Sequence, residues 1–202
     1  MTMAEPQSAA DLGPAARRLA DLVTHVKDDD LGRPTPCPAY SLGDLIEHVG
    51  GVALAFTAAA RKERSAYTDP PAPGDASRLG GDWRERIPRD LTALAGAWAD
   101  PAAWAGMTRI AGDDTPAGVV GLVLADELAV HGWDVARATG QPFACEPDIL
   151  AAALSFLQMF ASEDAPAGPE VGFGPATILL DEAPLLDRVV AMAGRDPGWS
   201  PA

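Results

Sequence analysis

The segment 125–140, ADELAVHGWDVARATG, constrains the fold of this chain most strongly, together with the apolar run 118–124 that leads into it. Apolar side chains recur there at the three- and four-residue steps of an α-helix. The predicted buried stripe contains Val120, Val123, Leu124, Glu127, Leu128, His131, Asp134, Val135 and Ala138. Thr115 and Pro116 offer an N-cap and a first-turn proline, and Gly140 can take the left-handed conformation that ends a helix. We therefore predict one long, largely buried helix.

Two polar residues interrupt this apolar stripe. Glu127 and His131 lie one turn apart in its middle, where a lone carboxylate is costly to bury. A metal ion is the first candidate for the compensating charge, because an E-x-x-x-H pair on one helical face can give two ligands to one ion. A third ligand must then come from elsewhere in the chain. The alternative is a metal-free cluster of buried ion pairs and hydrogen bonds.

The composition excludes several classes of protein. At 202 residues the chain is long enough for one domain with a substantial core. No apolar run approaches the ~20 residues that span a bilayer, and the first residues lack the pattern of a signal peptide. Cys37 and Cys145 are too few for a disulfide framework. The net charge of −14 argues against nucleic acid. We expect a cytoplasmic protein with no membrane and no nucleic-acid partner.

Helical periodicity extends to both sides of the central segment. The other expected helices cover 11–29, the residues from Ser41 to Phe56, 82–99, 147–160 and 185–193. Pro88 predicts a kink or a late start in the third of the long helices, whereas Pro147 suits a first turn.

The intervening segments are rich in turn residues. Three prolines within 31–40 predict an ordered loop, and 68–81 predicts a surface loop. Segment 104–112 is typical of a short extended excursion, after which 112–116, GDDTP, turns the chain into the central helix. Segment 176–180, ATILL, is strand-like.

Four long amphipathic helices predict an all-α fold, a four-helix bundle with an extra short C-terminal helix and minor strand-like segments. We expect a single domain over 1–202, with a bundle core at about 8–163 and a C-terminal extension at about 164–202. The core of such a bundle is a usual place for metal sites built from facing helices.

His48 is the candidate for the third ligand. It lies one helical turn from Leu45 and from Val52, so it borders the core. Such a histidine alone is more often a hydrogen-bonded core residue, but a buried glutamate and histidine elsewhere favour a ligand. Asp44, four residues earlier, either orients the His48 ring or completes a capping box with Ser41. Both interpretations stay open.

Other residues near these motifs can be given either a structural or a functional interpretation. Asp134 either hydrogen-bonds to a metal ligand or, more simply, pairs with Arg137. For Trp133, packing or a place in a pocket wall is favoured over a role in the chemistry of the site. Cys37 precedes the second helix, whose N-terminus can activate a thiol, but a small buried loop residue is the simpler account. His25 falls on the polar side of the first helix and is expected in solvent.

Three segments carry a resemblance to a known family. TPCPAYSLGDLIEHVGG, at 35–51, resembles the TPCP-x-(aromatic)-(x)₃-DL-(x)₂-H opening of the mycothiol-dependent maleylpyruvate isomerase N-terminal domain group. ADELAVHGWDVARATGQP, at 125–142, resembles the E-(x)₃-HGWD-(x)-A helix of that group and is the specific part. The ending FGPATILLDEAPLLDRVVAMAGRDPGW, at 173–199, resembles its short actinobacterial metal-binding members.

The resemblance implies a DinB-like four-helix bundle that holds a divalent metal, usually zinc. Carried over residue by residue, it implies His48, Glu127 and His131 as the ligands. Other DinB-like proteins use three histidines, so Glu127 places the chain with the isomerase branch. The isomerase has an additional C-terminal domain that contributes to its active site, and this chain is too short for a comparable one.

Three protein ligands leave one position open, the pattern of a catalytic zinc. Zinc in such a site can lower the pKa of a bound thiol or activate water, and the resemblance implies the thiol, with mycothiol as donor. We expect a zinc-dependent thiol transferase or isomerase, a monomer or homodimer, that acts on a small electrophilic molecule. The alternatives are a non-catalytic metal-binding domain that binds a ligand or partner, and a metal-hydroxide hydrolase.

Overall fold

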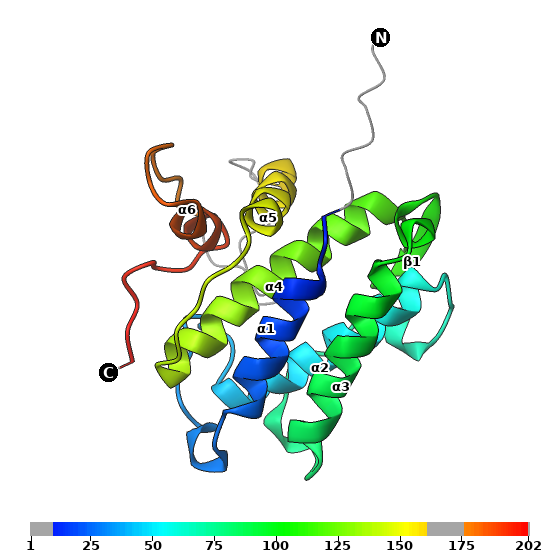
Figure 1. Cartoon of the computed structure of the whole chain (residues 1–202). Helices are drawn as coiled ribbons and strands as arrows, with labels where there is room; N and C mark the ends of the chain where they lie inside the picture. Colours follow the sequence, from blue (N-terminus) through cyan, green and yellow to red (C-terminus); the bar gives the residue numbers. More distant parts are fainter. Residues whose placement is uncertain (1–9, 161–175, 202) are drawn as a thin grey trace.

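The structure, a computed structural model, describes residues 10–160 and 176–201 (Figure 1). Within these ranges the chain forms six α-helices and one two-stranded hairpin. The α-helices are α1 Gly13–Thr24, α2 Leu42–Ala60, α3 Trp83–Trp98, α4 Ala117–Thr139, α5 Pro147–Phe160 and α6 Leu185–Met192. The strands are β1 Met107–Ile110 and β2 Asp113–Pro116, and short 3-10 helices occupy Asp28–Asp30, Ala66–Thr68, Ala76–Arg78 and Pro101–Trp104.

Four of these helices form the bundle that the sequence predicts. Helix α1 contacts α3 and α4, and α2 contacts the same two helices, so an apolar core is enclosed on four sides. The largest fully buried side chains include Leu19, Leu45, Ile46, Ile87, Leu91, Leu94, Leu124 and Leu128. Helix α5 lies on α4, and α6 lies on α5. The mostly helical fold is therefore confirmed. The expected limits of the bundle core at residues 8 and 163, and segment 164–175, lie outside the described residues.

The first helix is shorter than predicted. It ends at Thr24 and not at residue 29, and the chain continues into the 3-10 helix Asp28–Asp30. Three aspartates at a helix C-terminus oppose the helix dipole, which explains the early end. His25 caps the helix and is exposed, as expected. Helix α3 begins at Trp83 and runs through Pro88, so it does not start late.

The segment before α4 is a hairpin and not a simple turn. Ala111 and Gly112, with φ of 50° and 90°, form the two-residue connection, a conformation suited to paired strands. Thr115 is therefore not the N-cap that the sequence suggested, because it pairs with Thr108 in the hairpin. The N-cap position of α4 falls on Pro116, which makes no side-chain cap hydrogen bond. Gly140 ends the helix in the left-handed conformation, as predicted.

Segment 176–180 is not a strand, contrary to the expectation from its strand-like sequence. In the described parts of the chain the strands β1 and β2 pair only with each other, which leaves this segment without a neighbouring strand. The Thr177 N–H donates to the carbonyl of Ala191, near the end of α6. Ile178 and Leu180 are exposed. The strand-like composition of this segment therefore did not lead to a sheet, because β-propensity depends on the surrounding contacts.

One helix of the described residues, α2, is long and apolar enough to cross a membrane by length and composition. In the fold, 61% of its most apolar window is buried among the other helices. This burial fits a core helix.

Candidate metal centre

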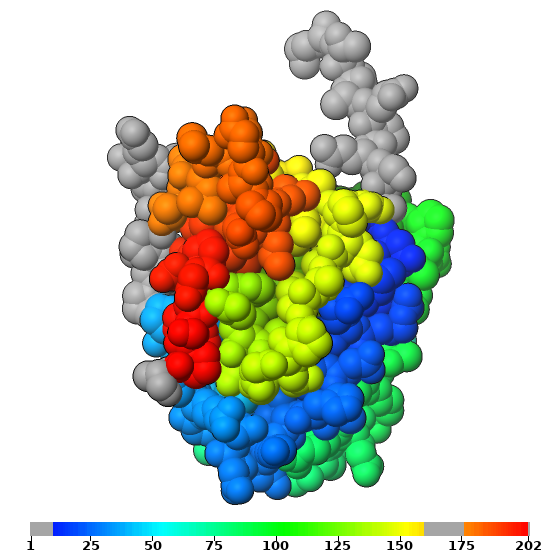
Figure 2. All heavy atoms as spheres, turned by 60° about the vertical axis from the view of Figure 1, so that its left-hand side comes forward, coloured from blue at the N-terminus to red at the C-terminus, as the bar shows by residue number. Residues whose placement is uncertain are grey.

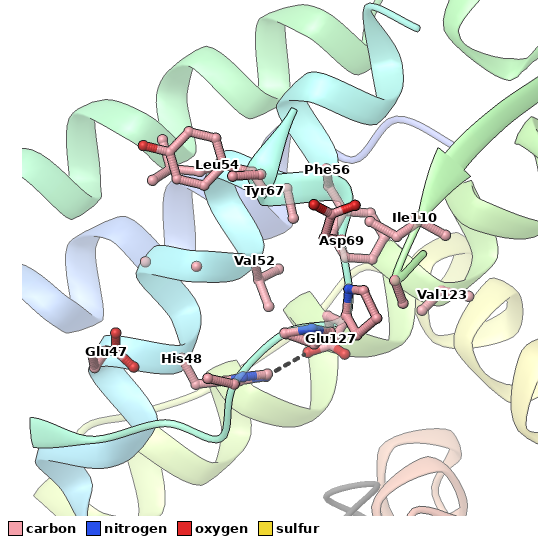
Figure 3. Close-up of a pocket in the computed structure, with 18 of the residues that line it drawn as sticks. Glu47, His48, Val52, Leu54, Phe56, Tyr67, Asp69, Ile110, Val123 and Glu127 are labelled. Carbon is pink, nitrogen blue, oxygen red and sulfur yellow. Dashed lines mark hydrogen bonds and ion pairs between the residues drawn. The ribbon is translucent and has the colours of Figure 1, made fainter. Parts of the chain in front are cut away.

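The structure brings together the three residues that the sequence singled out as ligands. His48 comes from the middle of α2 and Glu127 from α4 (Figure 3), and His131 comes from the next turn of α4. The Oε2 atom of Glu127 lies 3.2 Å from Nε2 of His48 and 3.2 Å from Nε2 of His131. The rings of the two histidines meet edge to face, with centroids 4.9 Å apart. Residues 79 positions apart in the chain thus share one cluster.

The start of α2 is fixed by its capping box, as predicted. The Asp44 N–H donates to Ser41 Oγ, and Asp44 Oδ2 accepts from the Ser41 N–H at 3.0 Å. The other oxygen of Asp44 accepts from the Ala76 N–H at 2.8 Å. Both carboxylate oxygens are therefore used at the helix terminus. Of the two interpretations of Asp44, the structure favours the cap over a contact with His48, whose ring instead lies 5.5 Å from the Tyr40 ring.

A second carboxylate holds His131 from behind. Asp134, one turn along α4, places Oδ2 at 3.1 Å from Nδ1 of His131. The same carboxylate accepts from the Arg195 guanidinium at 3.0 Å, and both side chains are fully buried. When Nδ1 of a ligand histidine donates to a carboxylate, Nε2 is left as the metal-binding atom. Arg195 is not among the candidates that the sequence indicates, because it lies 61 residues from Asp134 in a segment without periodicity.

Arg137, the expected partner of Asp134, points elsewhere. Its guanidinium donates to the carbonyls of Pro197 and Trp199 and lies 5.5 Å from the centre of the Trp133 ring. The C-terminal residues consequently lie against the C-terminal half of α4, as Figure 2 shows in red beside yellow-green. Trp133 is buried in packing and is not part of the cavity wall described below.

The charges of the cluster support one another. Burial acts to raise the pKa of Glu127, but the hydrogen bonds to His131 and His48 outweigh it and hold that pKa well below its usual range. Burial acts to lower the pKa of His131, but Asp134 and Glu127 outweigh it and raise that pKa to about 9. In the metal-free protein at neutral pH, a carboxylate therefore faces an imidazolium.

Asp126, next to Glu127 on α4, is an unexpected buried carboxyl. It is 1% exposed, and its Oδ1 makes no hydrogen bond within the described residues. Burial, reinforced by the charge of Glu127, raises its pKa to about 8. A neutral carboxylic acid is the form that such a position favours. Sequence periodicity missed Asp126 because it lies beside the predicted stripe and not on it.

Cys37 follows the simpler of its two interpretations. It is 1% exposed, and burial raises the pKa of its thiol although the charge of Arg195 opposes this. A raised pKa contradicts an activated thiolate, which requires a lowered one.

The donor atoms fit a zinc-sized ion. Zinc binds histidine nitrogen and carboxylate oxygen at ~2.0–2.2 Å, so two ligand atoms of a tetrahedral site lie about 3.4 Å apart. The atoms contributed by His48, Glu127 and His131 all lie within 4.8 Å of one another, and two of the separations are 3.2 Å. Two imidazoles and one carboxylate are also a known zinc donor set. The three residues can therefore hold a metal ion with small side-chain adjustments.

A large cavity opens on one side of this cluster. Its volume is about 770 Å³, and His48 and Glu127 form part of its wall (Figure 3). The other walls come from α2, α4, the β1–β2 hairpin, one residue of α5, the segment 66–72 and two arginines, Arg78 and, on α3, Arg86. A molecule in the cavity can thus reach two of the three candidate ligands.

Comparisons with known proteins agree with this arrangement. The mycothiol maleylpyruvate isomerase N-terminal domain family matches residues 12–136, which include His48, Glu127 and His131 but not Arg195. Two uncharacterized proteins from two strains of Mycobacterium tuberculosis are each 28% identical to the chain over 183 residues, which is 87% of this chain and 91% of theirs.

Among solved structures, the chain is similar to the mycothiol-dependent maleylpyruvate isomerase, with a TM-score of 0.60 and 19% identity. The similarity covers 83% of this chain and 77% of that enzyme, and a mutant of the enzyme gives the same TM-score at 18% identity. At this identity the likeness concerns the fold. The family match covers more than half of the chain, and the chain therefore belongs to the mycothiol maleylpyruvate isomerase N-terminal domain family.

Proposed function

We propose that the protein is a zinc-dependent thiol transferase or isomerase, which uses a low-molecular-weight thiol on a small electrophilic molecule. The observation that carries the proposal is the convergence of His48, Glu127 and His131 in one cluster, of which His48 and Glu127 line a large cavity. Three protein ligands leave one position for an exchangeable group, as in catalytic zinc sites. The similar isomerase is named as mycothiol-dependent, which supports mycothiol as the thiol.

In this proposal each residue of the cluster has a separate task. His48 and Glu127 present donor atoms to the cavity, and His131 completes the ligand set through Nε2. Asp134 accepts from Nδ1 of His131 and fixes the ring, while Arg195 neutralises Asp134 in the buried interior. Zinc held by these residues would supply Lewis acidity, which would lower the pKa of a bound thiol from ~8.5 so that the reactive thiolate exists at neutral pH.

Metal content tests the ligand set. The wild-type protein is expected to bind one equivalent of zinc per chain, and His131→Ala and His48→Ala are each expected to lose most of it. His25→Ala is the matched control, because His25 is exposed at the C-cap of α1 and its Nδ1 lies 2.7 Å from the carbonyl oxygen of Asp21. Elemental analysis after dialysis provides the measurement. A full equivalent of metal in His131→Ala would show that the ligand set is wrong.

The thiol is tested separately, on cobalt-substituted protein. Coordination of a thiolate to cobalt adds an intense charge-transfer band in the near ultraviolet, so mycothiol at millimolar concentration is expected to produce that band. Wild-type protein without cobalt gives the baseline. An unchanged cobalt spectrum would contradict the use of a thiol and leave metal-activated water, or ligand binding without turnover, as the function of the centre.

A further inference from the structure

The cavity beside the metal centre is elongated along two helices. From His48 and from Glu127 it continues along α2 and α4 at helical spacing, past Gly51, Val52 and Ala55 on α2 and past Val123 and Val119 on α4. At 1.5 Å per residue, these two stripes extend ~10 Å and ~12 Å from the ligands. The result is a groove with the candidate ligands at one end.

The walls of the groove are mainly apolar. Besides the valines and alanine of the two stripes, they include Phe56, Pro70, Pro71, Ile110 and Phe156. A volume of about 770 Å³ falls in the upper part of the ~300–1,000 Å³ range of sites for drug-sized molecules. Such a groove is much larger than a metal-bound water requires.

The far wall is held in place by hydrogen bonds. The Thr108 hydroxyl on β1 donates to the carbonyl of Ala59 on α2 at 2.6 Å. The Gly112 N–H at the tip of the hairpin donates to the carbonyl of Thr68 at 2.8 Å, in the segment that lines the mouth. The groove is therefore formed before any ligand enters, which reduces the entropy cost of binding.

The charges around the groove disfavour an anionic substrate. Two arginines line it, and both already donate to protein acceptors. Arg78 binds the Glu47 carboxylate at 2.9 Å and 3.0 Å, and Arg86 donates to the carbonyl of Leu79 at 2.9 Å. Asp69, which pairs with Arg109 at 3.8 Å, and Asp113 add two more carboxylates to the wall. A carboxylate or phosphate in the groove would therefore lie near carboxylates, and the two arginines there already bind protein groups.

We propose that the substrate of this site is an elongated, uncharged, apolar molecule. Its polar head reaches His48 and Glu127, and its hydrocarbon body lies along the groove between α2 and α4. This inference rests on the proposed function for the role of the head group, but the apolar groove itself is independent of bound metal. The two can therefore be tested apart.

The first test uses metal-free protein and the neutral dye N-phenyl-1-naphthylamine, whose fluorescence rises in apolar sites. Gly51→Trp is the blocking variant, because Gly51 lines the groove, is exposed on α2 and has no atom within 4 Å of a built Cβ. Gly96→Trp is the matched control, an equally open helical glycine on α3 outside the groove. The dye is expected to bind wild type and Gly96→Trp alike and Gly51→Trp at least ~10-fold more weakly. Equal binding of the dye to all three proteins would show that the groove is not an apolar binding site and would overturn the proposal.

The second test uses zinc-loaded protein and two hydroxamates that share a metal-binding head. Each buried methylene contributes roughly fourfold in affinity, so octanohydroxamate is expected to bind at least ~100-fold more tightly than acetohydroxamate. Gly51→Trp is expected to keep its zinc and its affinity for acetohydroxamate but to lose the long-chain advantage. Equal affinities of the two hydroxamates for wild type would overturn the substrate class.

The failures of the two proposals differ. If the protein binds zinc and acetohydroxamate but binds octanohydroxamate no more tightly, the metal centre stands and the proposal of an apolar substrate fails. Protein that binds no zinc, but binds the dye in a manner blocked by Gly51→Trp, retains the apolar groove and refutes the proposed function.

Discussion

The two sides of α4 meet very different surroundings. On the cavity side, Val119, Val123 and Glu127 line an open groove. The other side packs against the last residues of the chain, and we call it the C-terminal side. There Asp134 forms a fully buried ion pair with Arg195, and Arg137 binds carbonyls of Pro197 and Trp199. The cavity side provides space for a ligand, whereas the charged groups on the C-terminal side are already paired with other groups of the protein. His131 belongs to both, since Nε2 faces Glu127 and Nδ1 faces Asp134.

This difference separates recognition from stability. A partly exposed wall residue contributes little to folding, because it gains little burial, but it contacts whatever enters the groove. A buried ion pair has the opposite character, because removal of one partner leaves the other as an uncompensated charge. Substitutions on the two sides are therefore expected to separate ligand binding from the free energy of unfolding.

The largest effect is expected from Asp134→Ala on the C-terminal side. It leaves the Arg195 guanidinium buried without its carboxylate, which is expected to cost about 3–5 kcal/mol of unfolding free energy. It also removes the acceptor for Nδ1 of His131, so zinc affinity is expected to fall about 10–100-fold. Urea unfolding and zinc titration are the measurements.

The double variant Asp134→Leu/Arg195→Met is the control for this prediction. It removes both charges and keeps apolar volume, so most of the lost stability is expected to return while zinc affinity stays low. A loss below about 1 kcal/mol in Asp134→Ala would contradict the comparison.

Removal of the metal is expected to have the next largest effect. A ligand that binds only the folded state contributes about 2.7 kcal/mol when its free concentration is 100 times Kd. Chelation of zinc should therefore lower the melting temperature. The circular dichroism should remain helical, because the apolar core of α1 to α4 does not depend on the metal. A random-coil spectrum after chelation would mean that the cluster, and not this core, holds the bundle together.

The cavity side was predictable from the sequence to a greater extent than the C-terminal side. Glu127 and His131 are four residues apart, and helical periodicity alone places them on one face. His48 needed the further inference that α2 and α4 face each other, and the family resemblance supplied it. The sequence predicts only part of the hairpin that closes the groove, because 104–112 is expected to be extended but 112–116, which contains β2, is expected to be a turn.

Arg195 could not be found from local patterns. No periodicity of the last residues indicates that a charged side chain returns to the interior, and Arg137 offered a nearer partner for Asp134. Only the return of the chain after α6 onto α4 brings Arg195 to that carboxylate. Long-range pairing of buried charges depends on the complete topology, whereas amphipathic faces depend on neighbours within two turns.

A smaller effect is expected at the start of α2, from Asp44→Ala. Loss of the capping box is expected to cost about 1 kcal/mol, with zinc content unchanged, because Asp44 contacts Ser41 and Ala76 and not His48. A drop in zinc content would instead indicate that Asp44 orients His48.

The stability contributed by Asp44 should also depend on pH. Burial acts to raise its pKa, but hydrogen bonds from Ser41 and Ala76 outweigh it and hold the pKa below the ordinary aspartate value. A lowered native pKa stabilises the fold above the unfolded pKa of ~3.9, and this contribution is lost as the pH falls through the native value. The difference between wild type and Asp44→Ala should be constant near pH 6 and shrink below about pH 4.

The smallest effect on stability, and the sharpest contrast within α4, is expected from Val123→Ala. Val123 is partly exposed on the groove wall, so its truncation is expected to change the unfolding free energy by only about 0.5 kcal/mol. The control is Val120→Ala, the same chemical change one turn earlier at a fully buried position, where a cavity forms and the cost should exceed about 1 kcal/mol. For binding of the neutral dye the order of the two effects should reverse, because Val123 lines the groove and Val120 does not. If Val120→Ala weakens the dye as much as Val123→Ala does, binding senses the stability of α4 as a whole, and the division between its two sides is wrong.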